Sequence, residues 1–388
     1  MRLLPFEYAV RNLGRSPVRL AASVVGSALV VLLVLAAGGF VRGMVRSLAV
    51  SGNERNVILL GAGSEESLER SQIPMSVPTL VAASVPGIES RLGVESISPE
   101  VHMALVLKTS PDSHSDLQAV VRGVTPTAFL VHPQVQMIEG NLPRPGEYEL
   151  MVGRLAATRL DTDDTELAVG RQLWSDDRAW TITGRFAAPQ TVMDAEIWAP
   201  LTDLQIATRR DTLSCVVLTL DDASFEDVSI WCAQRLDLEL VALSESDYYA
   251  GLLTFYRPVR AMVWATAALI ALGGLFGGLN TMYAAFAARV RELGALQTLG
   301  FPRRALAVSF LQESLLATSA GGIVATLVGL LLLNGVAVRF SMGAFALSLD
   351  APVLAGGLAA GAALAVVGVI PPLWRCLRLP IVEAMRTD

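Results

Sequence analysis

Four long runs of apolar residues constrain this chain more than any other feature. Each run exceeds the roughly 20 residues with which a helix crosses about 30 Å of hydrocarbon, and the runs are Leu20–Val41, Ala261–Ala288, Ala305–Val338 and Ala351–Trp374. Only Glu313 interrupts them with a charge. Charged residues make up 17% of the chain, against about 25% in soluble domains. The sequence therefore predicts an α-helical membrane bundle of four transmembrane helices, within 20–46, 248–288, 305–338 and 351–374.

The distribution of charge predicts how these helices are oriented. The segments 1–19, 289–304 and 375–388 together hold 11 basic and 4 acidic residues, whereas 41–260 holds 18 basic and 30 acidic ones. Short cytoplasmic segments next to spans are enriched in Lys and Arg. We therefore expect both termini and the second loop in the cytoplasm, with 47–247 and a short loop at 339–350 outside.

The residues before the first span have an amphipathic pattern. Apolar residues such as Phe6 and Val10 alternate with Arg11, Arg15 and Arg19. We interpret 1–19 as a short helix on the inner leaflet, whose basic face suits anionic membrane lipid. A cleaved signal peptide is the alternative, but its apolar core is typically about 7–15 residues long, which is shorter than this run.

The outside segment has the composition of a mixed α/β domain. Short apolar strands are predicted at 56–60, 101–107 and 213–220, whereas glycines recur between short β-rich runs from 125 to 201. We expect an α/β lobe, formed by 47–124 and 202–247, with an inserted β-rich lobe at 125–201. Because the second run is longer than a span requires, the first two helices should continue outward, through about Ser47 and from about Tyr248, as a stalk.

Several kinds of catalytic site are excluded. The single lysine, Lys108, follows a leucine, so these residues form no Walker A motif. There is no G-x-S-x-G nucleophile motif. His102, His114 and His132 lie in separate segments without zinc-like spacing, and we interpret them as solvated or packed. The acidic cluster at 161–166 lacks the glycine and the final glutamate of a calcium loop, which favours a solvated turn. We expect no catalytic site, no metal and no nucleic-acid partner.

Two features leave alternatives open. Cys215 and Cys232 fall on a predicted strand and the next helix, where a disulfide is permitted, although two independent buried thiols are the favoured interpretation. Glu313 lies inside a span, where a charge is costly. It either reaches headgroups or pairs with an arginine such as Arg304, or it holds a contact between helices; a proton relay is least favoured.

The second loop contains a short amphipathic segment. Val290, Leu293, Leu296 and Leu299 form an apolar stripe at a spacing of three, and the helix should end at Gly300, ahead of a proline. Such a segment is either a cap between two spans or a contact for a partner.

The sequence of this segment resembles that of a known family. Arg291-Glu292-Leu293-Gly294, followed by Leu299-Gly300, is similar to the R-E-[IL]-G…[IL]-G signature of the MacB/LolC/FtsX permeases of type VII ABC transporters. The acid of the third span, the N-terminal segment 11–19 and the tail 380–386 also resemble that family, although the tail has one extra residue in the P-x-E-A-[LM]-R pattern. The resemblance covers both ends and all four spans.

The resemblance implies a MacB-type permease of the bacterial inner membrane without a fused ATPase domain. The second loop would be the coupling helix, which contacts a separate ABC ATPase subunit through Arg289, Arg291, Glu292, Leu293, Gly294, Leu296, Leu299 and Gly300. ATP and Mg would bind that subunit, and no cofactor would bind this chain. Further partners would be a second permease, most simply in a homodimer, and a membrane-fusion adaptor or a lipoprotein carrier.

We therefore expect a non-catalytic permease that converts ATP hydrolysis into motion of its outside domain and drives efflux or export. Scattered polar residues in the spans argue against a transmembrane pore. A lipoprotein-releasing permease is the first alternative, and a regulator of a cell-wall hydrolase is the second. A membrane enzyme lacks a candidate active site.

Overall fold

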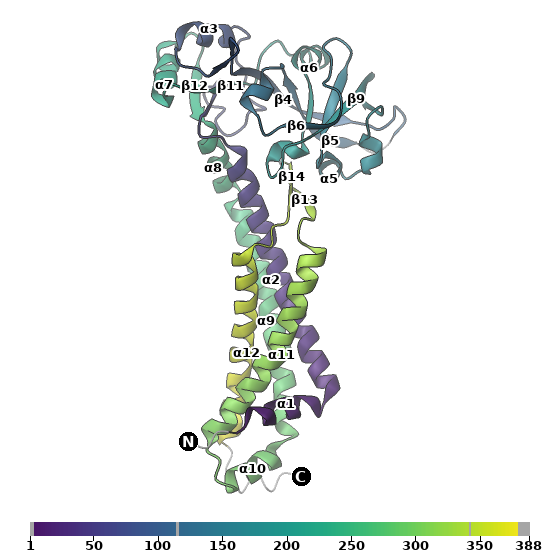
Figure 1. Ribbon diagram of the computed structural model, residues 1–388, viewed down its shortest axis with the longest axis vertical. Coiled ribbons are helices and arrows are strands. Elements are labelled where there is room, and N and C mark those ends of the chain that lie inside the picture. The colour runs from purple at the N-terminus through teal and green to yellow at the C-terminus, as the bar shows by residue number, and fades with distance from the viewer. Residues whose placement is uncertain (1–3, 114–115, 341–342, 379–388) are drawn as a thin grey trace. The chain divides into compact units, whose positions relative to one another are not determined.

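The computed structural model describes residues 4–113, 116–340 and 343–378. The tail motif at 380–386, the tail segment 379–388 and His114 lie outside the described residues. The chain divides into two compact units, one comprising Met1–Arg42, Pro258–Val336 and Leu347–Asp388 and the other Gly43–Arg257 and Ala337–Ala346 (Figure 1). We call them the helical unit and the sheet unit.

The long helices confirm the four predicted apolar spans, by length and composition. Among the described residues they are α2 (Pro17–Ser51), α9 (Arg257–Ala287), α11 (Arg303–Leu332) and α12 (Ala351–Arg378), and the short helices α1 (Phe6–Gly14) and α10 (Val290–Thr298) complete the helical unit. The third helix ends at Leu332, six residues before the predicted end of its span. Asn334 and Gly335 follow as a turn, and Gly335 has a φ of +81°, which ends a helix readily.

Small residues allow the spans to pack closely. A Cβ atom on Gly321 of α11 would collide with Ser27 of α2, and one on Gly357 of α12 would lie 2.5 Å from Leu35. Such close approach is a common basis of helix association in membranes. Leu35 is fully buried, together with Val31, in an apolar cluster of the three helices.

The sheet unit is built on ten strands. Their order is β12-β1-β11-β4-β5-β10-β7-β9-β6, with β8 paired to β9. The strands are β1 (Asn56–Gly61), β4 (Ile97–Leu107), β5 (Leu117–Val124), β6 (Gln136–Gly140), β7 (Glu149–Gly153), β8 (Gln172–Ser175), β9 (Arg178–Ala187), β10 (Ile197–Pro200), β11 (Cys215–Thr219) and β12 (Leu240–Ser244). The β5–β10 and β7–β9 pairs are parallel and the others are antiparallel.

Short helices and hairpins complete this mixed α/β unit, which agrees with the predicted class. They are α3 (Val77–Ser84), α4 (Ala128–Val131), α5 (Ala156–Leu160), α6 (Leu201–Thr208), α7 (Phe225–Gln234), α8 (Glu245–Phe255), the 3₁₀ turns η1 (Asp164–Leu167) and η2 (Val192–Ala195), and the hairpins β2–β3 (Ser90–Arg91 and Val94–Glu95) and β13–β14 (Ala337–Phe340 and Gly343–Ala346). Ser224 and Asp227 form a capping box at the start of α7, which satisfies two backbone N–H groups.

The expected inserted lobe is not separated by a break in the sheet. Strand β10 pairs with β5, so the strands of 125–201 continue the ladder of the flanking segments. The main apolar core likewise contains Val57 and Val101 together with Leu150 and Ile197. The boundaries at 125 and 201 therefore remain a prediction from the sequence.

The predicted loop at 339–350 contains regular structure. Residues 337–338, expected in the third span, belong to β13, and β14 packs on η2 within the sheet unit. Gly43 of α2 allows this hairpin to approach, because a Cβ there would lie 2.9 Å from the ring of Phe345. Helix α2 continues to Ser51, whereas two separate helices, α8 (from Glu245) and α9 (from Arg257), lead into the second span. The outward stalk remains a prediction from the sequence.

Candidate functional site

The second loop forms the helix that its sequence predicts. Helix α10 begins after Arg289 and ends at Thr298. Gly300 has a φ of +90°, in the left-handed region that glycine adopts without strain. Pro302 then cannot continue the helix and precedes α11.

The leucines of α10 have three different environments. Leu293 is buried by its own chain, in a cluster with Leu306, Phe310 and Val369. Leu296 is half-buried against this cluster, whereas Leu299 is 71% exposed. The sequence suggested one apolar stripe for a partner, but only the last leucine presents most of its surface.

Glu313 pairs with an arginine, as one sequence interpretation proposed, but the arginine is Arg289 and not Arg304. The Nη1 atom of Arg289 lies 3.3 and 3.2 Å from the two carboxylate oxygens of Glu313, and Asn12 of α1 donates to Glu313 Oε1 over 2.5 Å. Arg304 is exposed. The acid of the third span is thus buried and holds α1 and the start of α10 together.

A second set of contacts joins α1 to α10. The hydroxyl of Tyr8 donates to Glu292 Oε1 over 2.7 Å and accepts from Arg289 Nη2 over 3.1 Å. Arg15 also donates to Glu292 Oε1, over 3.1 Å. Partial burial opposes ionisation of Glu292, but the Tyr8 hydrogen bond and the charge of Arg289 lower its pKa. Glu292 is therefore bonded within its own chain, and we call Tyr8, Asn12, Arg289, Glu292 and Glu313 the loop network.

The energetic consequence is a stiff attachment of α10. A hydrogen bond to a charged group typically contributes about 1.5–3 kcal/mol. If Arg289 moves, Glu313 of α11 must therefore move with it, or the ion pair between them is lost. Arg291 and Gly294 flank the network: Arg291 is exposed and Gly294 is buried beside Leu293.

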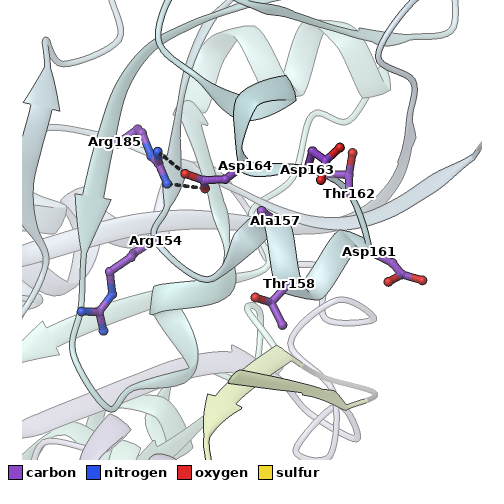
Figure 2. Close-up of a pocket in the computed structure, with 8 residues that line it drawn as sticks. All are labelled: Arg154, Ala157, Thr158, Asp161, Thr162, Asp163, Asp164 and Arg185. Carbon is purple, nitrogen blue, oxygen red and sulfur yellow. Dashed lines mark hydrogen bonds and ion pairs between the residues drawn. The ribbon is translucent and has the colours of Figure 1, made fainter. Parts of the chain in front are cut away.

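The sheet unit has an open polar hollow of about 780 Å³, drawn in Figure 2. Asp164 forms a two-bond ion pair with Arg185, at 2.6 and 2.8 Å, and Asp161 pairs with Arg339 of β13 at 3.0 Å. Figure 2 shows that Asp161, Asp163 and Asp164 point in different directions and do not converge. The arrangement agrees with a solvated turn and does not fit a calcium ion.

Two histidines, interpreted separately from the sequence, meet at one buried glutamate inside the sheet unit. His102 Nε2 lies 3.1 Å from Glu100 Oε2, and His132 Nε2 lies 2.9 Å from Glu100 Oε1. All three side chains are buried, and Arg122 donates to Glu100 over 2.9 Å. A signal was present, because Glu100 and His102 are two residues apart on a strand and so share a face.

This cluster does not fit a metal ion. Glu100, His102 and Cys215 bring three potential ligand atoms within 4.8 Å. However, Glu100 already accepts bonds from Ser98 and His132 at Oε1 and from Arg122 and His102 at Oε2. A carboxylate offers about four lone-pair positions, so none remains for an ion.

Both cysteines of the sheet unit are buried free thiols, Cys215 on β11 and Cys232 on α7. Burial raises the pKa of Cys232 to about 11 and that of Cys215 well above its usual range. In the structure the two cysteines are therefore separate, protonated thiols, which is the interpretation that the sequence favoured.

Comparisons with known proteins cover both units. The MacB-like periplasmic core domain family matches residues 20–229, and the FtsX-like permease C-terminal family matches residues 264–381. A curated relative, the macrolide export ATP-binding/permease protein MacB of Bradyrhizobium diazoefficiens, is 24% identical over 198 residues, which are 46% of this chain and 30% of the relative. The chain thus aligns with less than a third of that relative's length.

Two solved structures are similar in part. The periplasmic region of MacB from Actinobacillus actinomycetemcomitans is 10% identical, covers 53% of this chain and 95% of that chain, and gives a TM-score of 0.38. The extracellular domain of the noncanonic ABC-type transporter YknZ from Gram-positive bacteria is 11% identical, covers 48% and 99%, and gives a TM-score of 0.36. Scores below 0.5 add no argument, so the assignment rests on the two family matches. With its four apolar helices, the chain belongs to the MacB/FtsX-like permeases of type VII ABC transporters and is a multi-pass inner-membrane protein.

Proposed function

We propose that this permease transmits the work of ATP hydrolysis, performed by a separate ABC ATPase subunit, to its sheet unit. The observation that supports this most directly is the loop network. Helix α10 is short, and the buried pair of Arg289 and Glu313 joins its first turn to α11. A force on α10 therefore acts on a transmembrane helix without an intervening flexible contact.

The surface available to the ATPase is the exposed side of α10. Arg291, Ala295, Thr298 and Leu299 are exposed, and Leu299 is the largest apolar group among them. The excess of basic residues around this loop favours a cytoplasmic location. The Walker A motif missing from these 388 residues would be supplied by the partner, which would bind ATP and Mg.

Displacement can pass from the helical unit to the sheet unit along the chain. Helix α2 is continuous from Pro17 to Ser51, and the boundary between the units falls inside it, after Arg42. A helix carries axial displacement well, because each turn is held by backbone hydrogen bonds. Four residues separate the end of helix α11 from the start of β13 of the sheet unit.

The cargo would be handled by the sheet unit outside the membrane, in a homodimer of this chain and with an adaptor protein. Efflux is the function that we propose, with release of a lipoprotein to a soluble carrier as the alternative outcome. The two predict different partners for the outside domain, a membrane-fusion adaptor in one case and a soluble carrier in the other.

The test is binding and stimulation of the ATPase by the permease in nanodiscs. Truncating a buried anchor of an interface typically costs about 2 kcal/mol or more, so Leu299→Asp should weaken ATPase binding about 30-fold or more. Leu236→Asp is the matched control, since this leucine of the sheet unit is 81% exposed. Wild-type binding and wild-type stimulated hydrolysis in Leu299→Asp would contradict the proposal.

A further inference from the structure

The buried cluster around Glu100 extends to the first residue of α8. Glu100 and His102 lie on β4, Arg122 lies on β5, His132 follows α4, and Glu245 begins α8. All five are at most 5% exposed. The cluster lies where β4 passes from its pairing with β11, at 97–100, to its pairing with β5, at 101–107.

The proton on the imidazole of His132 can be assigned from its neighbours. Burial opposes ionisation of Glu100, but Arg122 and the two imidazoles hold the pKa of Glu100 well below its usual range. Glu100 is therefore an acceptor at its contact with His132 Nε2, and the Nε2 atom must carry a proton. The other nitrogen, Nδ1, is the one whose protonation remains open.

Nδ1 of His132 has no hydrogen-bond partner among the described residues, although it is buried. It lies 3.9 Å from Oε1 of Glu245. The second oxygen of Glu245, Oε2, accepts from the backbone N–H of Asn53 over 3.0 Å and from Asn56 Nδ2 over 2.9 Å. A neutral imidazole would thus direct a lone pair at a carboxylate oxygen, whereas a protonated one would direct an N–H group at it.

We propose that His132 and Glu245 form a proton-operated latch, in which uptake of one shared proton closes the 3.9 Å gap and ties the end of α4 to the start of α8. The latch adds pH sensing to the sheet unit and does not rest on the proposed function. The latch lies close in sequence to two long helices. Helix α8 leads the chain into α9, and Asn53, whose backbone N–H donates to Glu245, lies two residues after the end of α2.

The other titratable groups around His132 and Glu245 keep their charge state near neutral pH. His132 and Glu245 are therefore the principal site of proton uptake. Arg122 and Glu196 form a two-bond ion pair at 2.8 Å and stay charged near neutral pH. Burial raises the pKa values of Tyr249 and Cys215 well above their usual ranges, so both stay neutral. Burial and the charge of Arg122 lower the pKa of His102, whereas burial raises the pKa of Glu245.

Solvent can reach the cluster from one side. A cavity of about 130 Å³ is lined by His102, Arg122, Glu196 and Tyr249, among other residues. A water molecule needs only about 10–15 Å³ of such space. The cavity therefore offers protons a route as far as His102 and Arg122, both of which contact Glu100, the carboxylate bonded to His132.

The sign of the effect follows from proton uptake. The latch is closed at low pH and opens as the pH rises through the shared titration of the pair. Imidazole groups change charge between about pH 5 and 8, so α8 should be held more firmly at pH 5.5 than at pH 8.

The test uses the full chain in nanodiscs with ¹⁵N-labelled histidine, because the sequence holds only three histidines. The signal of His132 should pass from the Nε2–H tautomer to the imidazolium as the pH falls from 8 to 5. Over the same range, hydrogen-exchange protection factors of residues 245–256 should rise about tenfold or more, as expected for a hydrogen bond between charged groups. A His132 signal that stays in the neutral tautomer throughout would overturn the proposal.

Two variants separate the latch from general effects of pH. In Glu245→Gln the carboxamide can donate to a neutral Nδ1, so protection of α8 should lose its pH dependence. In His102→Gln the pH dependence of α8 protection should persist. An unchanged pH dependence in Glu245→Gln, or its loss in His102→Gln, would overturn the assignment. If either variant fails to fold, the wild-type histidine and exchange data decide alone.

Discussion

The two units each contain a buried charge network, and the networks differ in how open they are. In the helical unit, Arg289 and Glu313 are buried, but the network continues to Glu292, whose side chain is 34% exposed. In the sheet unit, the carboxylate of Glu100 is fully buried and saturated with hydrogen bonds. The first network can be displaced by a partner, whereas the second can respond only to a proton or to movement of the strands that form it.

This difference indicates a division of roles. In the function that we propose, the loop network would transmit force, because its member Glu292 lies at a surface that a partner could contact. A closed network fixes the relative positions of the strands and helices it joins. We therefore expect substitutions in the closed network to affect stability first, and substitutions in the loop network to affect coupling first.

The largest effect is expected from Arg122→Met. It removes the only guanidinium bonded to Glu100 and Glu196 among the described residues and leaves two carboxylates buried without their cation. Such a loss typically costs about 3–5 kcal/mol in the free energy of unfolding, and chemical denaturation of the full chain in nanodiscs measures it. Arg235→Met, at the surface pair with Asp237, is the control and should leave the unfolding midpoint unchanged. If the two variants were equally stable, the buried network around Glu100 and Arg122 would contribute no more to stability than a surface ion pair.

A smaller loss of stability, but a larger loss of coupling, is expected from Arg289→Met. The change deprives Glu313 of its ion pair, and hydrogen bonds to charged groups contribute about 1.5–3 kcal/mol. Permease-stimulated ATP hydrolysis should fall to the basal rate while ATPase binding persists, because Arg289 is buried. Arg304→Met tests the partner that the sequence suggested and should keep wild-type stimulation. If Arg304→Met uncouples and Arg289→Met does not, the pairing in the structure is wrong.

The helical unit could be predicted well because its signals are local in the sequence. The four apolar runs predicted the long helices. The spacing of Leu293 and Leu296 predicted the loop helix, and Gly300 ahead of Pro302 predicted where it ends. The lone acid, Glu313, marked the place of a buried network. The sequence offered Arg304 only as an example of a partner, whereas the first turn of α10 brings Arg289 to Glu313 of α11.

The sheet unit could be predicted only as a class. Strand order depends on pairings between distant residues, such as β5 with β10, and no local pattern encodes them. The contact of His132 with Glu100 joins residues 32 positions apart for the same reason. The hairpin at 337–346 was missed because its apolar residues, including Val338, continue the hydrophobic pattern of the third span.

A moderate effect is expected from Tyr8→Phe, which removes one hydroxyl from the exposed side of the loop network. The hydrogen bond to Glu292 should contribute about 1 kcal/mol to the attachment of α1. Because the pKa of Glu292 is lowered from its ordinary value of 4.5, this contribution is present above pH 4.5 and is lost as the pH falls further. The difference in melting temperature between the variant and the wild type should therefore vanish in acid. A difference that is the same at pH 7 and pH 4 would mean that the ionised form of Glu292 is not involved.

The smallest effect is expected from treating the protein with a reducing agent. This treatment tests whether a disulfide between Cys215 and Cys232 helps to hold the sheet unit around Glu100. Cys215 lies on β11, the strand paired with β4 at Glu100, so a disulfide to Cys232 of α7 would constrain the same region covalently. Such a bond typically stabilises by about 2–4 kcal/mol, and its loss would lower the melting temperature. Because both thiols are free, a reducing agent should leave the melting temperature unchanged, and alkylation after denaturation without reductant should label both residues. If only reduced samples are labelled, a covalent bond contributes to the rigidity that we assign to Glu100, Arg122 and Glu196.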